Sequence, residues 1–497
     1  MGEFAIVPRP VSVQYDSGTF QCRGIPAIAG DRSFQNEIDV FAGQLREILG
    51  EAGDQAKITL TRDAVGLAPE ESYRLRITPE GITLNAASGA GIYHGLQTLR
   101  QLFLSAPTEG GSLTIPCGII EDHPRFPWRG FMLDCSRYFY SVAFIKKLLD
   151  RLSLHHINIF HWHLTDDQGW RLPVKEYPLL TEIGARRQDH RLKDAYTGGF
   201  YTEDDIRDLV AFAAERHIEV VPEVDLPGHA SAILAAYPGL GCTGGPYRVE
   251  DRFGIFDDVL CAGNDGIFPL AEAVFNTLAE LFPSRYVHIG GDEVRFGYWE
   301  QCPKCRARLK ALGLSAFGEL QSWITSRLAG MLKERGRIAI GWDEVLENTE
   351  KFPLPDDLVV MSWRGREGGI TAANLGHRVI MTPNTEGCYL DYKQGDDPEE
   401  PGQLGAATLE RSYAMDPLPP GMTVPEDLIL GGQGNLWSEL IYAGKIAEYM
   451  IFPRICALAE GFWTPRGDKD FADFQRRLPV HQSRLDRLGV LHGSMEP

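Results

Sequence analysis

The sequence has little cysteine, no excess of positive charge and no long hydrophobic run. Nine cysteines among 497 residues are too few for a disulfide scaffold, and an odd number cannot all pair within one chain. A formal net charge of -19 argues against a nucleic acid partner and against an anionic membrane surface. No apolar stretch approaches the length of a membrane span. These absences indicate a globular protein whose partner is a small or neutral molecule.

The first ten residues, MGEFAIVPRP, also lack the basic segment, apolar stretch and cleavage site of a secretory leader. We therefore expect a cytoplasmic protein, with a secreted protein as the alternative if a leader has been removed. Nothing in the composition calls for a cofactor, and we expect none. The oligomeric state is left open.

The only closely spaced cysteines are Cys302 and Cys305, in the segment WEQCPKCRARL. Such a pair is half of a zinc site or a redox pair in some proteins, but no second pair with metal-like spacing follows. We therefore interpret the two as inert thiols at the start of a helix. Cys242 and Cys261 bracket a loop rich in Gly and Asp, where a disulfide is conceivable in an oxidising compartment.

The length and the apolar fraction of 43% predict two domains. Residues 1–122 fit a small α+β domain. Two alternating runs, 73–77 and 82–84, are joined by a Pro-Glu-Gly turn and predict a hairpin. Apolar residues at helical spacing follow over 92–103. The Pro-rich segment EDHPRFPWRG then predicts a boundary near residue 122.

Residues 123–497 repeat a theme of apolar strand followed by amphipathic helix. Near-continuous apolarity is typical of strands covered by helices on one side and by a barrel interior on the other. Eight repeats favour a (β/α)8 TIM barrel, the catalytic domain of this interpretation, over an open doubly wound sheet. The predicted strands are 129–135, 157–164, 218–224, 286–291, 338–342, 358–363, 378–383 and 428–433.

Two of the connecting segments predict clear helices, SVAFIKKLLDRLSLHH and TEDDIRDLVAFAAERH, the second with Thr202 as its N-cap. The segment between the fifth and sixth strands is too short and too Pro-rich for a standard helix. We therefore expect one degenerate repeat at that position.

The active site of such a barrel lies at the C-terminal ends of its strands, and every predicted strand here ends in polar or aromatic residues. Carboxylates and aromatics without a Ser-His or Cys-His signature indicate acid–base chemistry on an uncharged ligand. Aromatic faces with acids around them suit a sugar. In chain order the strand-end residues are Arg137, Asp166, Asp167, His229, Asp292, Glu293, Trp342, Asp343, Trp363, Tyr389, Asp391, Trp437 and Glu439.

The segment YVHIGGDEV places Asp292 and Glu293 side by side directly after a strand. Neighbours on a strand point to opposite faces, so the two acids can share a site only if the strand ends and the backbone turns before them. Gly290 and Gly291 are suited to such an irregularity.

Two other functions stay open at this point. His161 and His163 in HWH, together with His229 and His288, could be the ligands of a metal-dependent hydrolase, although His288 lies deep inside its strand. His229 could equally be a loop histidine oriented by Asp225. A carbohydrate-binding protein without catalysis is the non-enzyme alternative.

The motifs HIGGDEV, HWHLTDDQGWR, PEVDLPGH, GWDEV and LWSE, in this order, resemble the family 20 glycoside hydrolases, the β-N-acetylhexosaminidases. The resemblance covers essentially the whole chain, because that family also carries a small α+β domain before its barrel. It implies an exo-acting enzyme on a terminal N-acetylhexosamine of a small glycan or glycoconjugate. It also implies retention through a substrate-assisted oxazolinium intermediate.

The resemblance also assigns roles to the residues. Glu293 resembles the general acid and base, and Asp292 the residue that binds the N–H of the 2-acetamido group. Tyr389 would hold the acetamide oxygen. The other implied roles are a pocket wall of Trp342, Trp363 and Trp437, a clamp on sugar hydroxyls of Arg137, Glu439 and Asp391, and support of Glu293 by Asp166 and His229.

Overall fold

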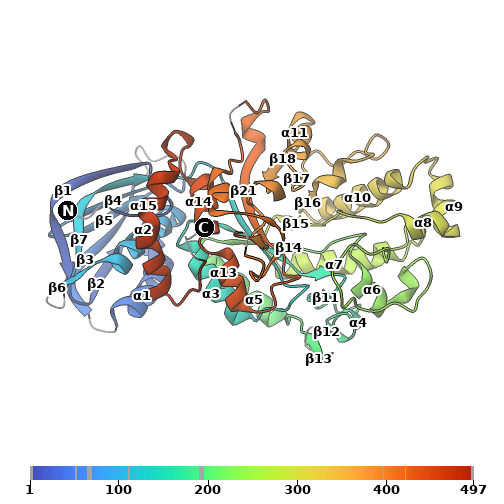
Figure 1. Ribbon diagram of the computed structural model, residues 1–497, viewed down its shortest axis with the longest axis horizontal. Coiled ribbons are helices and arrows are strands. Elements are labelled where there is room, and N and C mark those ends of the chain that lie inside the picture. Colours follow the sequence, from blue (N-terminus) through green and yellow to red (C-terminus); the bar gives the residue numbers. More distant parts are fainter. Residues whose placement is uncertain are drawn as a thin grey trace.

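A computed structural model of the chain describes residues 4–50, 53–63, 70–109, 112–189, 195–395, 397–419 and 421–493. Figure 1 shows two units, an N-terminal sheet with its helices and a larger barrel. The last strand of the N-terminal sheet ends at Asp122 and the first barrel strand begins at Trp128.

The N-terminal unit is a seven-stranded sheet in the order β1-β7-β4-β5-β3-β2, with β6 paired to β7. The predicted hairpin is β4 and β5, which pair antiparallel from Tyr73 and Ala86 to Thr78 and Gly81. The predicted helix is α2, whose N-cap Ser88 accepts a hydrogen bond from the backbone N–H of Gly91. The elements are β1 (Ser12–Cys22), β2 (Ile25–Gly30), α1 (Gln35–Leu49), β3 (Gly53–Arg62), β4 (Tyr73–Thr78), β5 (Gly81–Ala86), α2 (Gly89–Ser105), β6 (Thr108–Glu109) and β7 (Ser112–Asp122).

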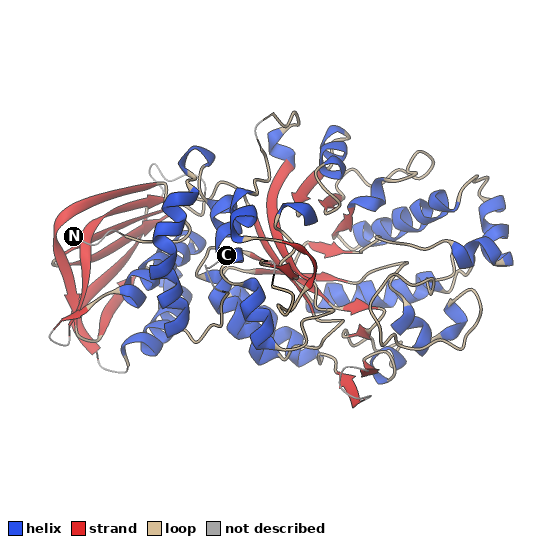
Figure 2. Cartoon of the chain, in the orientation of Figure 1, coloured by secondary structure: helices blue, strands red, loops and turns tan. Residues whose placement is uncertain are grey.

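The second unit is a closed barrel of eight parallel strands, which confirms the predicted (β/α)8 barrel and excludes the open sheet. Figure 2 shows the strands gathered at its centre with helices around them. Each strand overlaps one of the eight predicted runs. The strands are β8 (Trp128–Asp134), β9 (Ile159–His163), β14 (Glu219–Glu223), β15 (Tyr286–His288), β16 (Ile338–Trp342), β17 (Val359–Ser362), β18 (Arg378–Met381) and β21 (Ile429–Leu436).

The helices between the strands begin at polar caps. Ser141 caps the helix after β8, and Thr202 and Asp205 form a capping box at the helix after β9. Between β16 and β17 the described chain has only the 3-10 turn η4 (Asp343–Leu346), so the degenerate repeat is confirmed. The helices that follow the other strands are α3 (Val142–Ser153), α5 (Glu203–Ala214), α7 (Ile267–Leu281), α10 (Phe317–Glu334), α11 (Glu367–Asn374), α12 (Leu409–Ala414) and α14 (Arg454–Trp463).

The barrel also has short helices and strands, most of them in the loops that follow its strands. They build the rim of the site because active-site loops follow the C-terminal ends of barrel strands. They are β10 (Thr165–Asp166), β11 (Gly169–Trp170), α4 (Leu179–Glu182), β12 (Arg186–Asp189), β13 (Ala195–Gly198), α6 (Ser231–Ala236), α8 (Gly297–Gln301), α9 (Pro303–Ala311), β19 (Tyr392–Lys393), β20 (Gln403–Ala406) and α13 (Gly444–Ile451).

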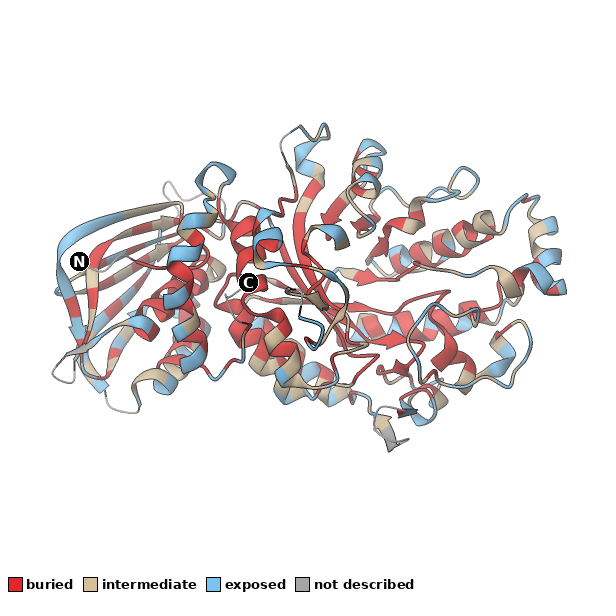
Figure 3. Cartoon of the chain, in the orientation of Figure 1, coloured by how far each residue is buried: buried red, intermediate tan, exposed pale blue. Residues whose placement is uncertain are grey.

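The barrel interior is filled in layers. Its strands are buried along almost their whole length (Figure 3). One apolar layer contains Ile159, Val221, Ile340 and Val359. Above it, His161, His163, His288 and Trp342 surround the buried carboxylate of Glu223. This polar layer forms the floor beneath the strand ends.

The C-terminal helix α15 (Phe471–Arg487) joins the two units, and Figure 1 shows it beside α2. Its buried Arg484 donates hydrogen bonds to the backbone oxygen of Ala5 and to Oε1 of Gln101 in the N-terminal unit. Arg477 of the same helix pairs with Glu460 of α14 at 2.7 Å. Within the described residues, no helix combines the length and the apolarity needed to cross a bilayer.

Candidate active site

A cavity of about 370 Å³ opens at the C-terminal ends of the barrel strands. That volume lies at the small end of the range for ligand pockets. Ten of the eleven predicted site residues line the cavity, and Asp166 does not. The ten are Arg137, His229, Asp292, Glu293, Trp342, Trp363, Tyr389, Asp391, Trp437 and Glu439.

The strand that carries the two acids ends early, as the pair of glycines predicts. β15 stops at His288, and Gly290, Gly291 and Glu293 all have positive φ, at 67°, 94° and 51°. A Cβ on Gly290 would lie 1.7 Å from Oδ1 of Asp225, so no larger residue fits there. Oδ1 of Asp225 accepts a hydrogen bond from the backbone N–H of Gly291 at 2.9 Å and holds the turn. Asp292 and Glu293 therefore both face the cavity.

His229 links the two acids to the residues behind them. Its Nε2 lies 3.7 Å from Oδ2 of Asp292 and 3.7 Å from Oε2 of Glu293. Its Nδ1 lies 3.2 Å from Asp166 and 3.1 Å from Asp167. Burial would lower the pKa of His229, but Asp166, Asp167 and Asp292 outweigh it and hold that pKa well above its ordinary value. The imidazole is therefore positively charged between two pairs of carboxyl groups.

The structure places Asp166 behind His229, from where it reaches Glu293 only through the imidazole ring. The imidazole Nδ1 is oriented by Asp166 and Asp167, not by Asp225 as the alternative for a loop histidine supposed.

Asp225 is instead the close neighbour of Asp292. Carboxylate oxygens of the two residues lie within 4.8 Å of each other, and both side chains are almost entirely buried. Burial raises the pKa of Asp225 to about 6, and burial together with Asp225 raises the pKa of Asp292 well above its usual range. Each of the two carboxyl groups thus opposes ionisation of the other, and they titrate as a coupled pair.

Arg137, Asp391 and Glu439 form a charged corner of the cavity. The guanidinium of Arg137 pairs with Asp166 at 2.8 Å and with Asp134 at 3.4 Å, and it lies over the ring of Trp437 at 5.0 Å. Burial would lower its pKa, but Asp166, Asp134 and Glu439 hold that pKa well above the ordinary value. Burial and the charge of Glu439 raise the pKa of Asp391. A fixed cation between carboxyl groups can bind the vicinal hydroxyls of a sugar.

Aromatic rings make up another part of the cavity lining, the aromatic wall. Trp363 and Tyr389 are stacked with an interplanar angle of 12° and centroids 6.1 Å apart. The ring centroid of Trp437 lies 5.8 Å from that of Trp342 and 6.3 Å from that of Tyr389. The wall therefore offers apolar faces for the C–H groups of a sugar ring or for a methyl group.

The sequence prediction missed one acid that supports this wall. Oε2 of Glu344 accepts a hydrogen bond from the indole N–H of Trp363 at 2.9 Å. Burial, with the charges of Asp292 and Asp343, raises the pKa of Glu344 to about 9. Glu344 follows Asp343 in the GWDEV motif. Its place in that motif is the only feature of the sequence that could have predicted a role in the site.

The histidines of the metal-hydrolase alternative do not form one site. His161, His163 and His288 have fully buried side chains and contact Glu223 at 2.8, 2.6 and 3.0 Å. None of the three lines the cavity, whereas His229 does. The three imidazoles are buried around Glu223 beneath the cavity, where a substrate cannot reach them. This burial disfavours a catalytic metal site at these histidines.

This barrel, with acids and an aromatic wall at its strand ends, has the site of a carbohydrate-active enzyme. Residues 126–466 match the family model described as glycosyl hydrolase family 20, catalytic domain, and residues 3–123 match glycosyl hydrolase family 20, domain 2. The chain belongs to glycosyl hydrolase family 20. The predicted family and the predicted class of enzyme, a glycoside hydrolase, are thereby confirmed.

Relatives of known name agree with this placement. The chain is 44% identical to a beta-hexosaminidase of Porphyromonas gingivalis over 85% of its own length, and 38% identical to one of Vibrio furnissii over 78%. These matches span 54% and 65% of the two relatives, so the chain corresponds to about half to two thirds of their length. Among solved structures, a GH20 exo beta-N-acetylglucosaminidase from Vibrio harveyi in complex with N-acetylglucosamine is similar, with a TM-score of 0.90 and 33% identity. That match covers 99% of this chain and 79% of the other.

Proposed function

We propose that the protein is an exo-acting β-N-acetylhexosaminidase that removes terminal, non-reducing GlcNAc or GalNAc from β-linked glycans, with retention of anomeric configuration. The observation that carries this proposal is the turn after β15, which directs Asp292 and Glu293 into one cavity beside an aromatic wall. The names of the hexosaminidase relatives and the N-acetylglucosamine complex of the Vibrio harveyi structure support it.

In the first step Glu293 protonates the glycosidic oxygen while the acetamide oxygen of the substrate attacks the anomeric carbon. The C1–O bond breaks, the aglycone leaves as an alcohol, and a bicyclic oxazolinium ion forms. Asp292 binds the acetamide N–H and balances the positive charge, while Tyr389 holds the acetamide oxygen. Trp342, Trp363 and Trp437 exclude water around the methyl group and the ring.

In the second step Glu293, now a carboxylate, removes a proton from water that attacks the anomeric carbon from the face the aglycone left. The acetamide regains its neutral form, and the sugar leaves with its original configuration. A retaining enzyme with a protein nucleophile needs two carboxyl groups about 5 to 5.5 Å apart on opposite sides of the sugar, and family 20 is a known substrate-assisted exception. Neighbouring acids on one turn suit a nucleophile that the substrate supplies.

The shape of the cavity supports exo action on a single sugar. Its volume of about 370 Å³ is small, and Arg137, Asp391 and Glu439 line one part of it. In this proposal they bind the O3, O4 and O6 hydroxyls of the non-reducing end. A chain extended at O4 would displace these contacts.

The raised pKa values of the coupled pair Asp225 and Asp292 predict the acid limb of the pH profile. Below about pH 6 the pair becomes fully protonated, and Asp292 can no longer oppose the oxazolinium charge, so kcat/KM should fall as the pH drops. In Asp225→Asn the negative neighbour is gone, the pKa of Asp292 falls, and the acid limb should move to lower pH. Profiles of kcat/KM between pH 4 and 8 measure this shift. A limb that stays in place or moves upward would refute the coupling.

The activity itself is tested with 4-nitrophenyl glycosides. Nitrophenol release is expected from the β-N-acetylglucosaminide and the β-N-acetylgalactosaminide but not from the β-glucoside, which lacks the 2-acetamido group. Equal rates on all three sugars, or binding of N-acetylglucosamine without release from any of them, would refute the proposal.

A further inference from the structure

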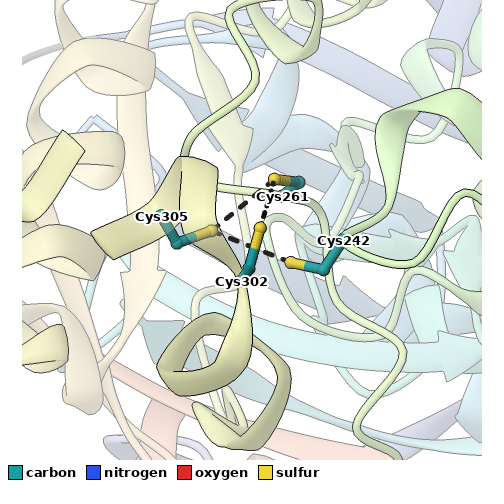
Figure 4. A group of neighbouring side chains, drawn as sticks. All are labelled: Cys242, Cys261, Cys302 and Cys305. Carbon is teal, nitrogen blue, oxygen red and sulfur yellow. Dashed lines mark hydrogen bonds between the residues drawn. The ribbon is translucent and has the colours of Figure 1, made fainter. Parts of the chain in front are cut away.

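Four cysteine sulfurs meet at one point outside the active-site cavity. Cys242 and Cys261 come from the loop after β14, while Cys302 and Cys305 flank the start of α9, and Figure 4 shows all four side chains converging. The sulfur of Cys305 lies 3.7 Å from that of Cys242 and 3.5 Å from that of Cys261. The sulfur of Cys261 lies 3.8 Å from that of Cys302. All four lie within 4.8 Å of one another.

These distances fit the edges of a tetrahedron around zinc. A Zn–S bond of about 2.3 Å places two sulfurs of a tetrahedral site about 3.8 Å apart. A disulfide would bring two sulfurs to about 2.05 Å, and the four residues are free thiols in this structure. The conceivable Cys242–Cys261 bridge is therefore not formed in this structure. Cys302 and Cys305, interpreted as inert thiols at a helix start, lie in one cluster with Cys242 and Cys261.

The surroundings favour thiolates at this point. Cys302 is the N-cap of α9, where unpaired backbone N–H groups stabilise negative charge. A Cβ on Gly263 would lie 2.2 Å from the carbonyl carbon of Lys304, so the glycine allows the two segments to approach closely.

We propose that Cys242, Cys261, Cys302 and Cys305 bind a structural zinc ion. Each thiol would lose its proton, and the tetrathiolate complex would carry a net charge of -2. Four sulfur ligands leave no open position, so the ion holds structure and takes no part in hydrolysis.

The zinc site ties together the two loops that carry the catalytic groups. The segment after β14 carries His229 and continues to Phe253 and Ile255, and all three residues line the active-site cavity. The loop after β15 carries Glu293 and leads into α8 and α9. Trp299 donates a hydrogen bond from its indole N–H to the backbone oxygen of Leu260, next to Cys261. A metal at this point would fix the position of His229 relative to Glu293.

Metal analysis of the intact protein tests the proposal without reference to activity. Protein purified with no added chelator and then desalted should contain about one zinc ion per chain, released by a mercurial reagent that modifies thiols. Protein that lacks the ion should take up about one equivalent of added ZnCl₂. Protein that neither contains zinc nor binds it, or that holds these cysteines as disulfides, would overturn the proposal.

Matched variants separate ligation from the general loss of a cysteine. Cys242→Ser, at the half-buried position, should reduce zinc from about one ion to near none per chain and lower the unfolding temperature. Cys242→His, which restores a ligand, should recover most of the zinc. Cys117→Ser, a buried cysteine of the N-terminal sheet, should keep the full content. Full zinc in Cys242→Ser, or equal loss in Cys117→Ser, would contradict the assignment.

Discussion

Glu293→Gln should lose activity in proportion to how poorly the aglycone leaves. For sugar aglycones, which need protonation to depart, kcat/KM should fall by about 10²- to 10⁴-fold. For 2,4-dinitrophenol, which leaves without a proton, kcat/KM should change little. The water-attack step also loses its base, so kcat should fall for all substrates. Steady-state kinetics across a series of aryl and sugar aglycones measure this dependence.

Azide and a surface variant are the controls for this prediction. Azide needs no base, so it should restore kcat of Glu293→Gln with the activated substrate and yield the β-glycosyl azide. Glu347→Gln changes an acid that is paired with Arg364 outside the cavity and should leave the kinetics unchanged. A loss of kcat/KM in Glu293→Gln that is equal for every leaving group would exclude Glu293 as the proton donor.

Asp292→Asn should lower kcat on N-acetyl substrates by about 10²- to 10³-fold, comparable to the removal of one preorganised electrostatic partner. The amide can still contact the acetamide N–H, but it carries no charge to oppose the oxazolinium ion. The change removes a carboxyl group that lies within 4.8 Å of Asp225, so repulsion in the free protein decreases and the fold should tolerate it. Initial rates with the 4-nitrophenyl substrate measure the loss.

Binding and turnover can be separated in this variant. Inhibition by N-acetylglucosamine should persist within about tenfold, because the hydroxyl-binding corner and the aromatic wall are unchanged. Turnover close to that of the wild type would remove Asp292 from the mechanism, whereas loss of binding together with turnover would indicate a collapsed site.

Most of the fold and the cavity lining could be predicted from the sequence. In a barrel, successive strands lie side by side and all their C-terminal ends lie on one face. Each apolar run of the second unit became a barrel strand, and strand ends such as those at Arg137, Trp342 and Trp437 meet at one face. Gly290 and Gly291 predicted the turn before Asp292, because glycine readily adopts the positive φ that such a turn requires. Without the turn, the two adjacent acids could not share the cavity.

The groups that were missed depend on contacts between distant segments. Asp225 precedes Asp292 by a complete strand–helix repeat, and only the packing of β14 beside β15 brings the two carboxyl groups together. Cys242 and Cys305 are 63 residues apart, and neither Cys242 nor Cys261 has a partner at metal-like spacing. Spacing rules detect ligands on one turn and cannot detect a cluster assembled from two loops.

The measurement that tests the central claim most directly is the response of turnover to the basicity of the acetamide. 4-Nitrophenyl β-glucosaminides whose N-acetyl methyl group carries zero, one, two or three fluorine atoms differ mainly in the nucleophilicity of the carbonyl oxygen. If the substrate supplies the nucleophile, kcat/KM should fall steeply with each fluorine, by several orders of magnitude in all. A nearly flat series, or comparable turnover of the β-glucoside, would mean that a protein group attacks the anomeric carbon and would contradict the account.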